Sequence, residues 1–89
     1  MSAYLITYDL NKPGARYDDL YEAIKSYGTY CHLVDSTWIV VSNSSAKSVY
    51  EKLKPNLDSG DHIFVVDISS QDRYGWLPKN IWDWINKHV

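Results

Sequence analysis

An aspartate closes a short apolar run near the start of the chain. Tyr8-Asp9-Leu10 follows Ala3-Tyr4-Leu5-Ile6-Thr7, a run typical of a buried strand. A carboxylate placed where such a strand meets solvent can bind a hard cation such as Mg²⁺. Asp9 can equally cap the loop that follows, because aspartate side chains readily bond to nearby backbone in turns. The residue type alone leaves both roles open.

Other polar groups near Asp9 in the sequence could contact an anionic substrate. Asn11, Lys12 and Arg16 form the best local anion-binding cluster, although solvated loop charges have the same appearance. The hydroxyl of Ser36, in a short polar connection, can contact phosphate or stabilise a turn. The sequence contains no recognisable catalytic triad, phosphate-binding loop or zinc-binding spacing.

The spacing of apolar residues predicts the elements that position these groups. Apolar residues at three- and four-residue intervals predict a first helix over 17–27, which Gly28 ends. Ser44 or Ser45 can cap a second helix, with Pro55 near its end. We therefore expect two amphipathic helices separated by β-rich sequence.

Four β-rich runs predict four strands, at 3–8, 30–34, 37–42 and 62–68. The connection Asp35-Ser36 is so short that the second and third strands must form a hairpin. The predicted element order is strand, helix, strand, strand, helix, strand.

This order predicts an α+β protein with a ferredoxin-like fold. Right-handed crossovers place the strands in the order 4-1-3-2 of an antiparallel sheet, with both helices on one face. The first and third strands are expected to be central and parallel. The end of the first strand should then lie beside Asp61 and His62, and near Ser42 and Asn43.

That arrangement suggests how a metal ion could be held. Asp9 together with Asp61, or with its own copy in a second subunit, would provide enough carboxylates for Mg²⁺, which keeps several waters. The alternative is that Asp61 only ends a turn and that the His62 ring lies in solvent.

A C-terminal tail, residues 69–89, follows the predicted domain at 1–68. Pro78 suits the first turn of a short Trp-rich helix in this tail. Strand residues such as 63–66 are consecutively apolar, so the helix-free face of the sheet also needs a cover. The tail or a second subunit can supply it. Because 89 residues bury a modest fraction of their surface, we expect a homodimer.

Composition restricts the classes of partner. The net charge of −2 and pI near 5.8 give no global basic field, so nucleic-acid contacts would depend on local groups or a metal ion. Cys31 is the only cysteine, which excludes an intrachain disulfide and suits a reducing cytoplasm. The N-terminal residues look like neither a signal peptide nor an anchor, so we expect a cytoplasmic protein without a membrane partner. The run 36–41 lacks the glycine and basic residues of an RNA-recognition module.

Three short motifs resemble a known family: Ile6-Thr7-Tyr8-Asp9-Leu10, Lys25-Ser26-Tyr27-Gly28 and Asp35-Ser36-Thr37-Trp38. They are similar to the second CRISPR-associated protein family, the small dimeric subunit of the spacer-integration complex. The chain looks closer still to the stand-alone SinR-like relatives, and more distantly like the VapD toxin ribonucleases. The resemblance covers residues 1–68.

The resemblance implies a ferredoxin-like homodimer in which Asp9 is the catalytic ligand for Mg²⁺ in a phosphodiesterase. Tyr8 and Ser36 match family positions beside it. One hypothesis is therefore a magnesium-dependent endonuclease acting on RNA or DNA, with Asn11 and Arg16 contacting phosphate. The other is a non-catalytic homodimeric interaction module of a defence-related or mobile-element system, since the family also includes structural dimers.

Overall fold

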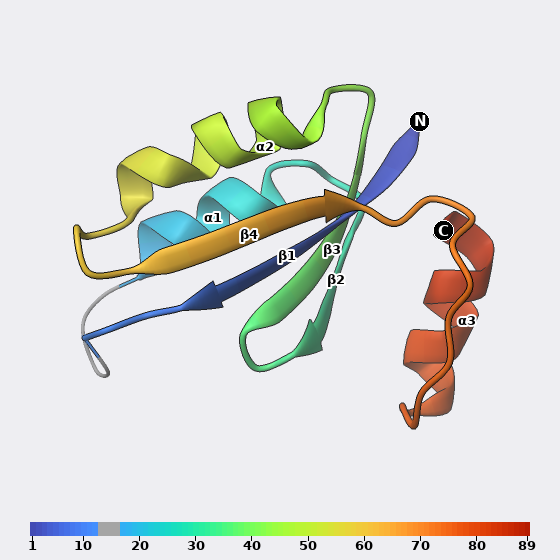
Figure 1. The fold of residues 1–89 in the computed structure, drawn as a ribbon. Coiled ribbons are helices and arrows are strands. Elements are labelled where there is room, and N and C mark those ends of the chain that lie inside the picture. The colour runs from blue at the N-terminus through green and yellow to red at the C-terminus, as the bar shows by residue number, and fades with distance from the viewer. Residues whose placement is uncertain (13–16) are drawn as a thin grey trace.

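The computed structural model describes residues 1–12 and 17–89. Its strands form a four-stranded antiparallel sheet in the order β2-β3-β1-β4, as expected from the sequence (Figure 1). The strands are β1 (Ser2–Asp9), β2 (Tyr30–Val34), β3 (Thr37–Ser42) and β4 (His62–Asp67). The helices within the described residues are α1 (Asp18–Lys25), α2 (Ala46–Leu53), the 3-10 helix η1 (Lys54–Asn56) and α3 (Lys79–His88). The chain has an α+β fold compatible with the ferredoxin-like arrangement, with an additional C-terminal helix.

Local sequence explains where the two sheet-packing helices begin and end. The N-cap of α2 is Ser45, whose side chain accepts a hydrogen bond from Ser48 N at 3.1 Å. Two aspartates, Asp18 and Asp19, occupy the first turn of α1, where the helix dipole favours negative charge. Gly28 follows α1 with φ +83°, a left-handed conformation that glycine adopts at little cost.

Both helices cover the same face of the sheet, as Figure 1 shows. Alternate β1 residues, Tyr4, Ile6 and Tyr8, point toward them and are buried. They pack against fully buried side chains of α1 and α2, including Leu20 and Val49. Complete burial of each such aliphatic side chain stabilises the fold by roughly 1.5–3 kcal/mol. This core fixes which β1 side chains must face the other way.

The tail packs against part of the helix-free face. Ile85 of α3 is 4% exposed and forms a second buried cluster with Ala3 of β1 and Ile39 of β3. Half-buried side chains of the tail, including Trp82 and Leu77, surround this cluster. Among the described residues, no helix combines the length and apolar character needed to cross a bilayer.

The expected parallel direction of the two central strands is wrong. β1 and β3 are antiparallel, and Ser42 lies opposite Ser2, at the far end of the sheet from Asp9. The reason is topological: α1 returns the chain so that β2 has the same direction as β1, and the tight hairpin then reverses β3, which lies between them. Ser42 and the adjacent Asn43 are therefore not neighbours of Asp9.

Candidate functional site at the end of β1

Asp9 is the last residue of β1, and its side chain is exposed on the helix-free face of the sheet. Its direction follows from strand alternation, because the preceding Tyr8 is buried in the core beneath the helices. In the ladder between β1 and β4, Asp9 lies directly opposite His62. Opposite residues in an antiparallel pair share one face, with Cβ atoms about 5 Å apart. The structure thus places a carboxylate and an imidazole next to each other.

A small open hollow, the Asp9 hollow, lies around this pair. It has a volume of about 250 Å³ and is lined by Thr7, Tyr8, Asp9, His62, Ile63 and Phe64. The Thr7 hydroxyl lies 3.2 Å from the hydroxyl of Thr37, and the Phe64 side chain is 60% exposed. The hollow combines one carboxylate, one imidazole, a hydroxyl and an aromatic surface.

Asp61 has a structural role in the loop below the hollow. Its Oδ1 accepts hydrogen bonds from Asn11 N at 2.8 Å and from the Tyr17 hydroxyl at 3.0 Å, and its Oδ2 accepts one from Asp58 N at 2.8 Å. Partial burial raises the pKa of Asp61, but these hydrogen bonds and the nearby Lys12 outweigh burial and lower it. Both oxygens are engaged, so Asp61 positions the loop and is poorly placed to share a metal ion with Asp9.

The Tyr8 side chain lies on the opposite face of the sheet from the Asp9 carboxylate. Its hydroxyl accepts a hydrogen bond from Trp38 Nε1 at 2.9 Å and lies 3.4 Å from the Asp35 carbonyl oxygen. Burial raises the pKa of Tyr8, and the bond from Trp38 opposes this rise. Tyr8 therefore anchors the end of β1 to the helix-covered core. Its hydroxyl is directed away from the Asp9 carboxylate, so the predicted contact between the Tyr8 side chain and a substrate does not follow from this arrangement.

The other predicted contact residues lie at different distances from the hollow. The Ser36 carbonyl accepts a hydrogen bond from Tyr8 N at 3.1 Å, which places the hairpin turn beside the end of β1. Asn11 is exposed two residues beyond Asp9, and its side chain packs so closely on Gly60 that a Cβ there would collide with it. Arg16 lies outside the described residues.

The carboxylate of Asp9 is available to a cation, although one subunit offers few ligands. Within the described residues, Asp9 has no side-chain hydrogen bond or ion pair, and no group of three or more His, Cys, Asp or Glu side chains could enclose a metal ion. A Mg²⁺ ion accepts one or two carboxylates when waters and substrate phosphates complete its shell. The residues thus fit Mg²⁺ if a substrate or a second Asp9 contributes the remaining oxygens.

Sequence reasoning placed His62 at the correct end of the sheet but did not identify it or Phe64 as part of a site. The alternation of side chains along β4 indicates which of them share the face of Asp9. His62, Phe64 and Val66 share one face, and the register places them opposite Asp9, Thr7 and Leu5. The exposed side of β4 could have been recognised from this pattern.

Comparison with known proteins does not assign the chain to a family. No protein-family model matches it, and no curated protein matches it either. The family similarity suggested by the three sequence motifs remains a prediction.

Proposed function

We propose that the protein is a magnesium-dependent endonuclease-like phosphodiesterase that acts on RNA or DNA as a homodimer. The observation that supports this proposal best is that the Asp9 carboxylate is exposed and accepts no hydrogen bond within the described residues. Asp61 and Asp67 both accept hydrogen bonds from backbone amides, as capping aspartates do, whereas the Asp9 side chain has no such bond within the described residues. An exposed, unengaged carboxylate opposite an imidazole fits ligand binding better than capping.

The polar side chains of the Asp9 hollow have distinct roles in this proposal. Asp9 binds Mg²⁺, which supplies charge stabilisation at the scissile phosphate and a more acidic water. His62, within reach of the same space, transfers a proton to or from the reacting oxygen. Thr7 donates a hydrogen bond to a phosphate oxygen.

A second subunit completes the proposed site. The half of the helix-free face formed by β1 and β4 keeps apolar side chains near solvent, with Phe64 the most exposed and Leu5 and Val66 half-buried. A two-fold interface on this half-face would cover them and bring two Asp9 carboxylates toward one substrate. The acidic pI makes a metal ion the natural bridge to a polyanion.

A cleavage assay on matched variants tests the proposal. The wild type should cleave single- or double-stranded RNA or DNA only with Mg²⁺, and Asp9→Asn should lower the rate by about 10³-fold or more, since a metal interaction is worth several kcal/mol. Asp19→Asn removes an exposed carboxylate on α1, beyond the opposite face of the sheet, and should retain full activity. Cleavage that survives repeated purification and is unaffected by Asp9→Asn would refute the assignment.

A second function, a non-catalytic homodimeric interaction module, is favoured by a different observation. The described residues of one subunit gather fewer than three metal-binding side chains at any point, while Phe64 is exposed on an apolar half-face. A purified wild type that dimerises but neither cleaves nucleic acid nor binds Mg²⁺ would support this module.

A further inference from the structure

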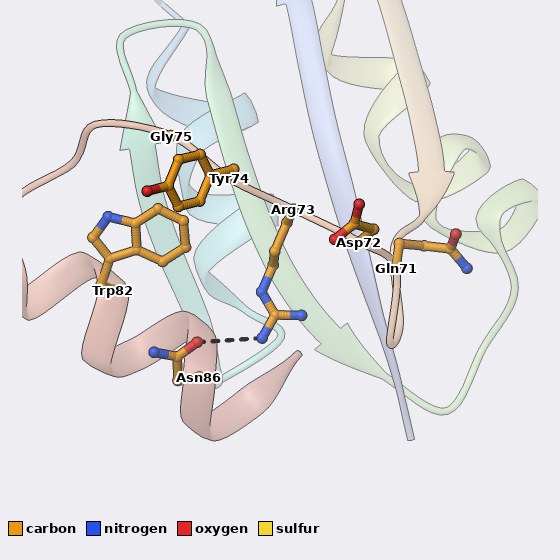
Figure 2. Close-up of a pocket in the computed structure, with 7 residues that line it drawn as sticks. All are labelled: Gln71, Asp72, Arg73, Tyr74, Gly75, Trp82 and Asn86. Carbon is orange, nitrogen blue, oxygen red and sulfur yellow. Dashed lines mark hydrogen bonds between the residues drawn. The ribbon is translucent and has the colours of Figure 1, made fainter.

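A second and larger hollow lies between the extended segment 71–75 and α3. This tail hollow has a volume of about 530 Å³, within the range of small-molecule sites (Figure 2). It is lined by Gln71, Asp72, Arg73, Tyr74, Gly75, Trp82 and Asn86. None of these residues takes part in the site around Asp9.

The first unusual property of the tail hollow is that aromatic side chains at it are exposed to solvent. The Tyr74 side chain is fully exposed, although a tyrosine ring gains free energy from being covered. In Figure 2 its ring extends toward α3, on the side where Trp82 lies. Trp82 is half-buried because part of its side chain packs against the cluster of Ala3, Ile39 and Ile85. Trp76, just beyond Gly75, is also fully exposed.

A guanidinium held near these rings is the second property. Arg73 Nη2 donates a hydrogen bond to Asn86 Oδ1 at 3.3 Å, which directs the side chain toward α3 (Figure 2). Within the described part of the chain, no carboxylate forms an ion pair with Arg73. A guanidinium has five donors, so several remain for an anionic ligand. Asp72 lines the same hollow and would weaken the binding of such a ligand.

We propose that the tail hollow binds a nucleotide unit, with the planar base against Tyr74 and Trp82 and the phosphate on Arg73. Stacking on aromatic rings combined with arginine contacts is how proteins bind nucleotides without reading their sequence. The unit comes either from a free nucleotide or from a single-stranded nucleic acid. The proposal does not depend on cleavage at Asp9.

Titration followed by two-dimensional NMR tests this proposal in the full chain. Uridine monophosphate should shift the signals of Arg73, Tyr74 and the Trp82 indole N–H. The indole N–H of Trp38, which is buried in the core and bonded to Tyr8, serves as the internal control and should not move. Tyr74→Ala should weaken binding about fivefold or more, the effect of losing one base–aromatic stack.

The role of Arg73 is isolated by comparing the nucleotide with the nucleoside. The wild type should bind uridine monophosphate more tightly than uridine, and Arg73→Gln should remove this preference. Lys47→Gln, on α2 and away from the hollow, is the matched charge control. Asp72→Asn should tighten binding of the nucleotide, because it removes a neighbouring negative charge.

The source of the ligand follows from a third titration, with a short oligouridylate. Tighter binding of the oligomer identifies a strand as the ligand, and binding of the monomer alone identifies a free nucleotide. The proposal is overturned if millimolar nucleotide leaves the tail signals unchanged, as expected for a protein-docking surface, or if Arg73→Gln retains the preference for the phosphate.

Discussion

His62 is the residue whose proposed role rests most directly on strand register. Its imidazole lies opposite Asp9, so His62→Gln should remove proton transfer and lower kcat about 10²-fold. Binding of Mg²⁺ should persist, because Asp9 is retained. Cleavage rates at saturating Mg²⁺, measured together with the Mg²⁺ affinity of each protein, check this role. A variant that loses Mg²⁺ affinity in parallel with kcat would show that His62 is a metal ligand instead.

The hydrogen bonds of Asp61 predict a stability that depends on pH. Folding lowers the pKa of this carboxyl, so its contribution is complete above the ordinary aspartate pKa of about 3.9 and is lost as the pH falls through the lower, folded value. Asp61→Asn should therefore melt below the wild type at pH 7, and the two melting temperatures should converge on acidification below pH 4.

Thermal unfolding followed by circular dichroism from pH 7 to pH 2.5 measures this difference. Asp9→Asn is the control, since the Asp9 side chain is exposed and has no hydrogen bond or ion pair within the described residues. A gap between wild type and Asp61→Asn that stays constant over the whole range would mean that the Asp61 carboxylate does not support the loop electrostatically.

At the level of secondary-structure elements, α3 stabilises the sheet by covering part of its helix-free face. Ile85 is 4% exposed against Ala3 and Ile39, so Ile85→Ala should cost about 2–5 kcal/mol of unfolding free energy. For a domain of this size the melting temperature should fall by roughly 10 °C or more. Lys87→Ala, on the exposed side of α3, should change it little. A melting temperature unaffected by Ile85→Ala would mean that the tail is not part of the cooperative fold.

The elements were predictable from the sequence to different degrees. Apolar periodicity and turn residues identified α1, α2 and the strands, and Ser45 was one of the two expected caps. The direction of β3 was misjudged although the hairpin at Asp35-Ser36 determines it. The hydrogen bond between Trp38 and Tyr8 was not predictable, because it joins residues thirty positions apart through side-chain geometry.

At the level of the whole molecule, the exposed half-face formed by β1 and β4 predicts a dimer. Sedimentation at micromolar concentration should report two chains per particle. Phe64→Lys should shift the equilibrium to monomer, because it places a charge in the middle of the apolar half-face. Lys47→Gln on α2 should leave it unchanged. A wild type that stays monomeric as concentration rises would show that the tail alone suffices to cover the sheet.

The overall architecture followed from the sequence more completely than the site did. Strand order depends on element order and crossover handedness, which a single sequence can indicate. The site depends on which polar groups are left unengaged, and that is decided by tertiary hydrogen bonds. Asp9 and Asp61 look alike in the sequence, yet only Asp61 is held by the loop 58–61 and its partners Asn11 and Tyr17.

The most direct test of the Asp9 site is paramagnetic broadening by Mn²⁺, which takes the same oxygen ligands as Mg²⁺. Substoichiometric Mn²⁺ should broaden the amide signals of Asp9, His62 and Phe64 first. Excess Mg²⁺ should reverse the effect, and Asp9→Asn should abolish it while the remaining spectrum stays native. Three results would contradict a metal site at the end of β1. The signals do not broaden, the broadening centres on other carboxylates such as Asp67 or Asp72, or it persists in Asp9→Asn.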